Sequence, residues 1–299
     1  MNNFIEYFYN IKVSEIENKD NYYSFYYLNN LYRLYINNDN ININIYYLNK
    51  NMLNNTLVSE IILNKDSGMI SSYEGINYIL LKINCNPNKD ITLDEINYLS
   101  NIITRNDLKI DYGILWSNKI DYLEELIYEN GKKYPLVVDS FNYFVGMAEN
   151  AISYYNNIHE INSNPIFYIS HKIIRPNDKI DTIYNPFNII FDYKVRDIAE
   201  YIKNSFWNNN KNIFIELDNY LSYEYLSIYD VKLLISRVLY PSFYFDTYED
   251  IFINNKDEKI INNYISRSNE YEKYLSNIID YFKIRYPIEE VLWLKKNNI

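Results

Sequence analysis

Glycine, proline and cysteine are all scarce in this chain, which has five Gly, seven Pro and one Cys in 299 residues. The single thiol, Cys85, cannot form an internal disulfide, and this fits a reducing compartment. A nucleophilic cysteine needs a nearby base, and the only histidines are His159 and His171. We therefore interpret Cys85 as a buried structural thiol.

The first glycine in the chain is Gly68. A loop that holds phosphates with its backbone N–H groups depends on glycine, because only glycine allows the backbone to approach so closely. A glycine-rich phosphate loop is therefore excluded from the N-terminal part of the chain.

Positive charge is also in short supply. Lys and Arg number 29 against 39 Asp and Glu, which gives a net charge of -10 and a pI near 4.9. Nucleic acids and anionic membranes attract basic residues, so neither is an expected partner. The N-terminus has no basic start followed by an apolar run, and no segment approaches the ~20 apolar residues that a membrane span needs. We expect a cytoplasmic protein with no membrane span.

Tyrosine is abundant, with 36 residues, and asparagine and isoleucine are also frequent. This composition is typical of an AT-rich genome, or of a polar, aromatic and aggregation-prone sequence. The first interpretation is favoured because the asparagines are spread along the chain and interrupt well-patterned helices. The Tyr-rich runs YYSFYY and YPSFYFDTY are interpreted as core packing, with an aromatic surface for assembly as the alternative.

Residues 1–85 are predicted to be rich in strands. YYSFYYLN and LYRLYIN meet at Asn29–Asn30, which tolerates positive φ and predicts a tight hairpin. A helix is expected from about Ile41 to Leu53. LVSEIILN and INYILLKIN then form a second pair of strands around a connection rich in turn residues.

Residues 86–299 are predicted to be mainly helical. Thr92 and Glu95 resemble a capping box, Gly131 ends one helix and Pro135 begins the next. Residues 165–192 interrupt the helices as a strand, an irregular loop and a second strand. Another helix is expected from Val195 to Trp207.

This layout, with FVGMAENAI (Phe144–Ile152), ISHKIIRPND (Ile169–Asp178) and FDYKVRDIAEYI (Phe191–Ile202), resembles the kinase-like family of spore-coat S and aminoglycoside phosphotransferase proteins. The likeness spans nearly the whole chain and is greatest to degenerate spore-coat members from low-GC Gram-positive bacteria. It implies a protein-kinase-like α+β fold, with a small antiparallel five-stranded N-lobe carrying one helix and a larger, mainly helical C-lobe. It places a degenerate catalytic loop at residues 165–192.

The resemblance also identifies the positions where phosphoryl transfer would take place. The family's His-x-Asp motif reads His171-Lys172-Ile173 here, so Ile173 stands where the catalytic base is expected, and an isoleucine cannot accept a proton. The following metal-binding positions fall on Asp178 and Asp192. These two carboxylates are the implied ligands for Mg²⁺ if the chain still binds ATP.

The residues at the positions expected to contact a nucleotide differ from the family's pattern even more. The lysine expected on the third strand is replaced by Tyr35, and Arg33 lies two residues earlier on the same predicted face. Arg33 is a weak candidate for contact with a phosphate.

Each of the retained residues also has a structural interpretation. His171 can hydrogen-bond to the backbone, and Asp192 can be an ordinary carboxylate at a strand end. Asp197 and Glu200 match a capping box, and the family's Asp at the position of Asp197 braces the catalytic loop. Arg196 can pair with Asp192 or Asp178, where it would fill the place of the magnesium charge.

Three hypotheses follow. The first is a pseudokinase-like binding or scaffold protein that has a protein partner, in spore-coat assembly and therefore spore-associated. The second is a divergent small-molecule phosphotransferase that uses ATP and Mg²⁺ through Asp178 and Asp192. The third is a generic α+β protein with a chance likeness to kinases. The sequence leaves the oligomeric state open.

Overall fold

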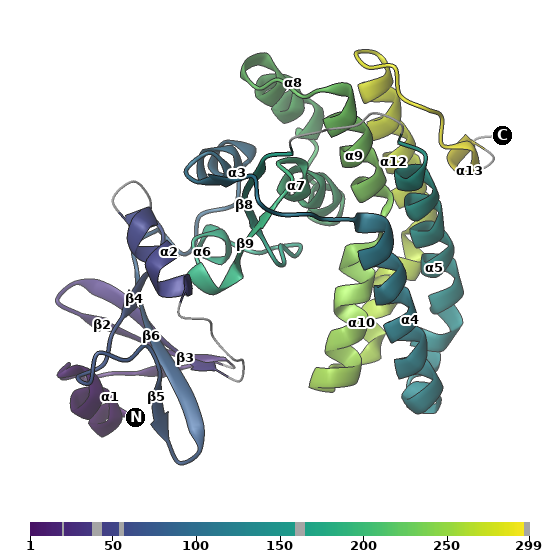
Figure 1. The fold of residues 1–299 in the computed structure, drawn as a ribbon. Coiled ribbons are helices and arrows are strands. Elements are labelled where there is room, and N and C mark those ends of the chain that lie inside the picture. Colours follow the sequence, from purple (N-terminus) through teal and green to yellow (C-terminus); the bar gives the residue numbers. More distant parts are fainter. Residues whose placement is uncertain (20, 38–43, 54–56, 159–164, 296–299) are drawn as a thin grey trace. The chain divides into compact units, whose positions relative to one another are not determined.

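The computed structural model describes residues 1–19, 21–37, 44–53, 57–158 and 165–295. The chain forms two compact units (Figure 1). The N-terminal unit contains Met1–Ile103 and Ile169–Phe191, and the C-terminal unit contains Thr104–Tyr168 and Asp192–Ile299. The lobe boundary expected at residue 85 stays a prediction.

The N-terminal unit is built on a six-stranded antiparallel sheet. Its strand order is β1-β2-β3-β6-β4, and β5 also pairs with β6. The strands are β1 (Glu17–Asn18), β2 (Tyr22–Tyr27), β3 (Asn30–Asn37), β4 (Glu60–Ile62), β5 (Ser71–Tyr73) and β6 (Ile76–Ile83). The sheet thus has one strand more than the five that the resemblance implies. The residue pattern itself locates four of the strands, because β1 and β5 are too short to give a periodic pattern.

The hairpin between β2 and β3 is confirmed, but its turn lies one residue earlier than expected. Leu28 and Asn29 have φ values of 48° and 62°, the positive pair that defines a type I′ turn. Asn30 begins β3, and its side-chain amide donates to the Leu28 carbonyl across 2.9 Å. Asn30 therefore braces the turn from outside and does not form part of it.

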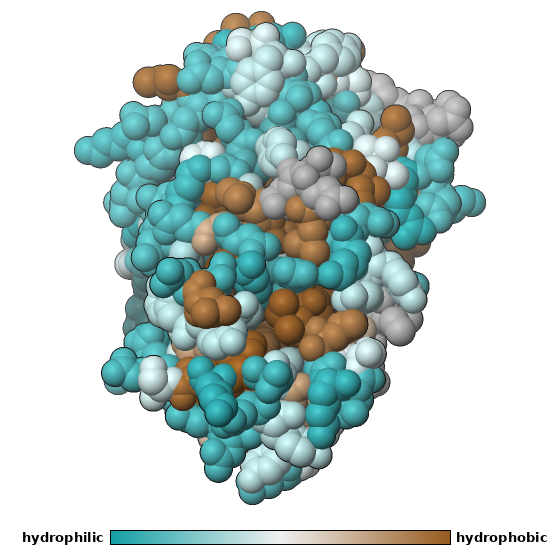
Figure 2. Space-filling view, turned by 90° about the vertical axis from the view of Figure 1, so that its left-hand side faces the viewer, coloured by the Kyte–Doolittle hydropathy of each residue, from teal (hydrophilic) through white to brown (hydrophobic). Residues whose placement is uncertain are grey.

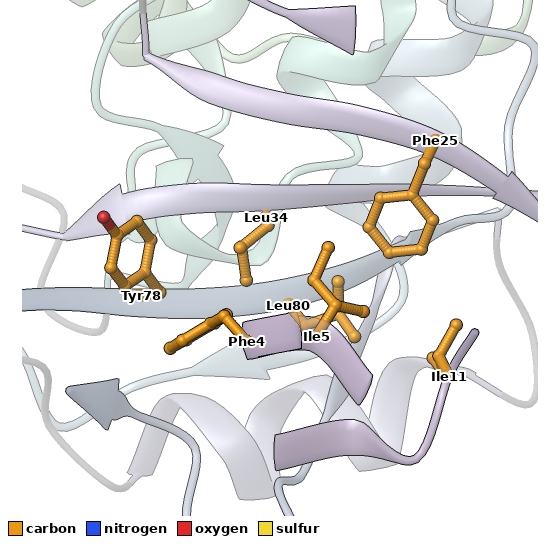
Figure 3. Close-up of a cluster of buried hydrophobic side chains, with 7 residues drawn as sticks. All are labelled: Phe4, Ile5, Ile11, Phe25, Leu34, Tyr78 and Leu80. Carbon is orange, nitrogen blue, oxygen red and sulfur yellow. The ribbon is translucent and has the colours of Figure 1, made fainter. Parts of the chain in front are cut away.

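Helix α1 (Asn2–Tyr9) covers one face of this sheet (Figure 3). Phe4 and Ile5 of α1 are buried against side chains from three strands. The cluster drawn in Figure 3 consists of Phe4, Ile5, Ile11, Phe25, Leu34, Tyr78 and Leu80. The sequence interpretation includes one helix in this region, α2 (Asn44–Leu53), and it overlooks α1. The start of α2 expected at residues 41–43 lies outside the described residues.

The unit is completed by a helix and a segment that returns from the C-terminal half of the chain. Helix α3 (Leu93–Ser100) begins after Thr92, whose hydroxyl accepts from the Glu95 N–H across 3.3 Å. The returning segment contains α6 (Ile180–Ile183) and the short 3₁₀ helix Pro186–Asn188.

The C-terminal unit is mainly helical, as predicted. Its two longest helices are α4 (Tyr112–Asn130), which ends at Gly131, and α5, which begins at Pro135. The helices that follow α4 are α5 (Pro135–Asn156), α7 (Val195–Trp207), α8 (Ile213–Tyr223), α9 (Ile228–Leu239), α10 (Ser242–Asn254), α11 (Asn262–Ser266), α12 (Ser268–Lys283) and α13 (Leu292–Lys295). The bounds predicted for α7 are confirmed.

Aromatic residues fill much of this helical core. Phe144 of α5 stacks on Tyr244 of α10, with ring centres 3.8 Å apart, and Tyr248 is fully buried. The predicted core role of the run YPSFYFDTY is therefore confirmed. A three-stranded sheet of order β7-β8-β9 completes the fold. Its strands are β7 (Thr104–Arg105), β8 (Phe167–His171) and β9 (Ile189–Asp192), and β7 pairs with β8 in antiparallel orientation.

Hydrophobic side chains also reach the surface, between hydrophilic ones (Figure 2). They include Tyr26, Leu28 and Tyr225. Among the helices that the structure describes, none has the length and apolar character needed to cross a membrane.

Candidate functional site

The segment between β8 and β9 is the strand-loop-strand feature predicted from the sequence. His171 ends β8 and is buried, and its Nε2 lies 2.9 Å from the carbonyl oxygen of Ile183. The expected hydrogen bond from this histidine to the backbone is therefore present. His171 ties the start of the loop to α6.

Ile173, the residue at which the resemblance places the catalytic base, is 37% exposed. Its backbone N–H donates to Asn188 Oδ1 across 3.1 Å, and Asn188 Nδ2 donates to the Ile173 carbonyl across 2.8 Å. This double hydrogen bond holds the loop backbone in place although the side chain carries no acid or base. Asn188 is missed by sequence reasoning, because its partner lies 15 residues away.

Asp178 closes a turn within the loop. Its Oδ2 accepts from the backbone N–H of Arg175 across 2.7 Å, and its own N–H donates to the Arg175 carbonyl across 3.2 Å. Burial raises the pKa of Asp178, although the hydrogen bond from Arg175 acts in the opposite direction. The metal-binding role of Asp178 stays a prediction.

Asp192 is 3% exposed and accepts three hydrogen bonds from the C-terminal unit. Oδ1 accepts from the Tyr112 hydroxyl at 2.6 Å and from the Tyr193 N–H at 2.7 Å. Oδ2 accepts from Arg196 Nη1 at 2.6 Å, which is the pairing expected from the sequence. Both oxygens are thus engaged by the protein, and Arg196 supplies the positive charge. Tyr112 comes from α4, 80 residues away, and is not predicted.

The capping box proposed for Asp197 and Glu200 is wrong. Helix α7 begins at Val195 with Lys194 at its N-cap, so Asp197 lies inside the first turn and is buried. Glu200 lies a further turn into the helix, where it faces the core. A carboxylate there cannot reach the free N–H groups of the helix start.

Glu200 is instead the centre of a buried ionic cluster. Its Oε1 lies 3.0 Å from Lys203 Nζ and 3.1 Å from Arg237 Nη2, and Oε2 accepts from the Ser242 hydroxyl at 2.7 Å. Burial alone would raise the pKa of Glu200, but Lys203 and Arg237 outweigh it and lower the pKa to about 2. The guanidinium of Arg237 also lies 5.0 Å from the centre of the Tyr112 ring, so this cluster adjoins Asp192 through Tyr112.

In the N-terminal unit, Arg33 and Tyr35 lie on the same face of β3, as predicted. Arg33 Nη1 donates to the Tyr35 hydroxyl at 3.3 Å and forms an ion pair with Asp181 of α6. Its guanidinium lies 4.7 Å from the centre of the Tyr22 ring. The candidate phosphate ligand is thus already paired with a carboxylate.

Metal-binding groups are sparse in the part of the chain that the structure describes. It contains no cluster of three or more His, Cys, Asp or Glu side chains that could hold an ion. The roles of Asp178 and Asp192 as a pair of metal ligands, and of Arg33 toward a nucleotide, stay predictions.

The fold is similar to solved antibiotic phosphotransferases. An aminoglycoside phosphotransferase from Alicyclobacillus acidocaldarius matches with a TM-score of 0.60 and 10% identity, over 90% of this chain and 92% of that one. Spectinomycin phosphotransferase APH(9)-Ia, solved with ADP and spectinomycin, matches with a TM-score of 0.54 and 12% identity, over 98% and 95% of the two chains. The kinase-like α+β fold is therefore confirmed, and the chance likeness is ruled out.

A sequence relative is known from Bacillus subtilis (strain 168). It is the endospore coat-associated protein YutH, which is 27% identical over 208 residues. The match covers 62% of this chain and 61% of the length of that relative.

A family pattern also matches residues 2–278, which is well over half of the chain. Its extent includes the three segments on which the kinase-like resemblance rests, from Phe144 to Ile202. The chain therefore belongs to the family described as "Spore coat putative kinase YutH".

Proposed function

We propose that this chain is a kinase-fold protein that does not transfer phosphate and that acts as a binding or scaffold module in the spore coat. The coat assignment follows the family description and the name of the B. subtilis relative. The main observation against phosphate transfer is the pairing of Asp192 with Arg196.

Phosphoryl transfer requires a cation that neutralises the phosphates and a group that orients the attacking hydroxyl. A magnesium ligand must offer a carboxylate oxygen to the ion. Here Oδ2 of Asp192 accepts from Arg196 at 2.6 Å, and Oδ1 accepts from Tyr112 and from the Tyr193 N–H. An ion would have to displace a partly buried guanidinium, which would then lose its anion.

The second defect supports the same proposal. Ile173 has no proton acceptor in its side chain, and the backbone around it is held by Asn188. A loop that is held in place by hydrogen bonds but carries no proton acceptor at this position suits binding better than catalysis. The interaction of such a module would be with a protein of the coat.

The alternative, a divergent ATP-dependent phosphotransferase, retains one supporting observation. Asp178 uses Oδ2 for the Arg175 N–H, and its Oδ1 forms no hydrogen bond with any described residue. That oxygen is the one that a metal ion would need.

A transfer assay separates the two proposals. The purified chain is incubated with γ-labelled ATP and Mg²⁺, with and without a panel of aminoglycosides and small alcohols. We expect no release or transfer of label above that of an Asp192→Asn variant. Mg²⁺-dependent turnover that Asp192→Asn abolishes would overturn the pseudokinase proposal and establish the alternative.

A further inference from the structure

We propose that a groove between helices α4 and α5 is a docking site for a short basic segment of a partner protein, which also carries an aliphatic side chain. Both helices belong to the C-terminal unit. The inference rests on the proposed binding role and names the class of partner for it. It uses none of the residues that bear on phosphate transfer, so the two proposals can fail separately.

The groove runs along one side of the α4–α5 pair. It has a volume of about 470 Å³ and is lined by residues within 117–124 and 149–157. On each helix the lining residues recur at intervals of three and four, so each helix presents one continuous face to the groove. Helix α10 covers a different face of the pair, where the Tyr248 hydroxyl donates to the Leu123 carbonyl at 2.7 Å.

Negative charge stands on both walls of the groove. Asp121 and Glu124 line it from α4 and Glu149 lines it from α5, and none of the lining residues is basic. All three carboxylates are exposed, and none has an ion-pair or hydrogen-bond partner among the residues that the structure describes. Lys119 is the one basic residue of the two helices, and it pairs with Glu249 of α10 instead. A positively charged partner would therefore meet uncompensated carboxylates on two sides.

The base of the groove is apolar. Ile120 of α4 is 7% exposed, and Ile152 of α5 is partly buried. The other uncharged lining residues are serines and asparagines, which can donate to and accept from a peptide backbone. A bare cation would leave the two isoleucines in water, whereas an aliphatic side chain beside the cation would cover them.

The shape of the groove favours a segment of a protein over a small free cation. A pocket for a small molecule encloses most of its ligand and is mainly apolar. Here the walls are exposed and mostly polar, so the ion pairs of a free polyamine would be screened by water and salt. The lined part of α4 extends over about 10 Å, which is the length of about three residues of an extended peptide. That length suits two basic side chains and one aliphatic side chain.

A peptide-binding assay tests the site. The probe is a fluorescein-labelled peptide of repeated Lys-Leu-Lys triplets, and its binding to the whole chain is followed by fluorescence anisotropy at physiological ionic strength. The groove variant removes the three charges of the site: Asp121→Asn, Glu124→Gln and Glu149→Gln. The matched control removes three exposed charges of the same helices that do not line the groove: Glu125→Gln, Glu129→Gln and Asp139→Asn. The two variants have equal net charge, so a general attraction of the peptide to an acidic protein changes equally in both.

We expect the groove variant to bind the peptide about tenfold more weakly than the wild type, and the control variant to lose less than about threefold. Ser153→Arg places a cation in the groove and leaves the carboxylates intact, and it should also weaken binding. Asn150→Arg adds the same charge to α5 outside the groove and should have little effect. Circular dichroism establishes that each variant keeps its helix content.

The proposal is overturned if the wild type does not bind the peptide, or if the groove variant and its control lose affinity equally. It is also overturned if spermine binds the wild type more tightly than the peptide does and the groove variant removes that binding, because the groove would then be a polyamine site. Asp192→Asn should bind the peptide as the wild type does, which keeps this result apart from any finding on phosphate transfer.

Discussion

Arg196 lies four residues after Asp192 and donates from Nη1 to Oδ2 of that carboxylate across 2.6 Å. The resemblance to kinases places a metal ligand at this carboxylate, and in the structure the arginine provides its counter-charge from within the chain. The pair thus stabilises a folded state that has no need of an ion at Asp192.

Loss of this arginine should destabilise the C-terminal unit. Arg196→Met would leave Asp192 buried with two neutral donors, Tyr112 and the Tyr193 N–H, and no positive partner of its own. Breaking a buried ion pair costs about 3–5 kcal/mol, and the remaining donors should limit the loss to about 2–3 kcal/mol. Urea unfolding followed by circular dichroism measures the change.

The matched control for that experiment is Arg285→Met. Arg285 pairs with Asp218 at 2.7 Å, but both side chains are exposed. An exposed pair contributes less than about 1 kcal/mol. Equal losses in the two variants would contradict the role given to Arg196.

The Glu200 cluster predicts a specific dependence of stability on pH. The pKa of Glu200 is lowered from 4.5 to about 2 in the folded chain. Between pH 2 and pH 4.5 the folded state therefore binds fewer protons than the unfolded state. Its contribution, about 3 kcal/mol, is present above pH 4.5 and is lost as the pH falls toward 2. Glu200→Gln should therefore have a lower free energy of unfolding than the wild type at pH 7, and the difference between the two should shrink below pH 4.5. A difference that stays constant from pH 7 to pH 3 would refute this role of Glu200.

The turn at Leu28 offers a stabilising change. Leu28 has a φ of 48° and is 75% exposed, so it bears the cost of a left-handed conformation without burying its side chain. That cost is roughly 1–2 kcal/mol for most residues and is smaller for asparagine. Leu28→Asn should raise the free energy of unfolding by about 1 kcal/mol. Leu57→Asn, which replaces another exposed leucine, should have no such effect.

Helix α1 should contribute to the stability of the N-terminal sheet. Ile5 is fully buried beside Leu34 and Leu80 (Figure 3), and truncation of a buried isoleucine to alanine costs about 2–5 kcal/mol. Ile5→Ala should speed hydrogen exchange in β2 and β3. Asn3→Ala, exposed on the same helix, should leave exchange unchanged, and similar exchange in both variants would argue against docking of α1.

Local signals in the sequence predicted much of the helical unit. Pro135, Gly131 and the span Val195–Trp207 were located because proline, glycine and a 3.6-residue apolar period act within a few residues. The pairing of Arg196 with Asp192 was one of the two expected from the sequence, and the residues lie only four positions apart, at the end of β9 and the start of α7.

Contacts between distant parts of the chain were not predictable in this way. Tyr112 reaches Asp192 from 80 residues away, and Arg33 reaches Asp181 from 148 residues away, so no local pattern links either pair. The turn at Leu28 was misplaced because leucine carries no preference for positive φ, whereas Asn29–Asn30 does. The capping box expected at Asp197 is wrong because the helix begins three residues earlier than that motif requires.

Titration with Mn²⁺ followed by electron paramagnetic resonance shows whether Arg196 takes the place of a metal ion at Asp192. Free Mn²⁺ gives a strong signal that binding diminishes, so the number of bound ions is counted without any assay of activity. We predict that the wild-type chain and its Asp192→Asn variant bind the same number of ions, with or without ATP. An ATP-dependent Mn²⁺ site in the wild type that Asp192→Asn removes would contradict the account.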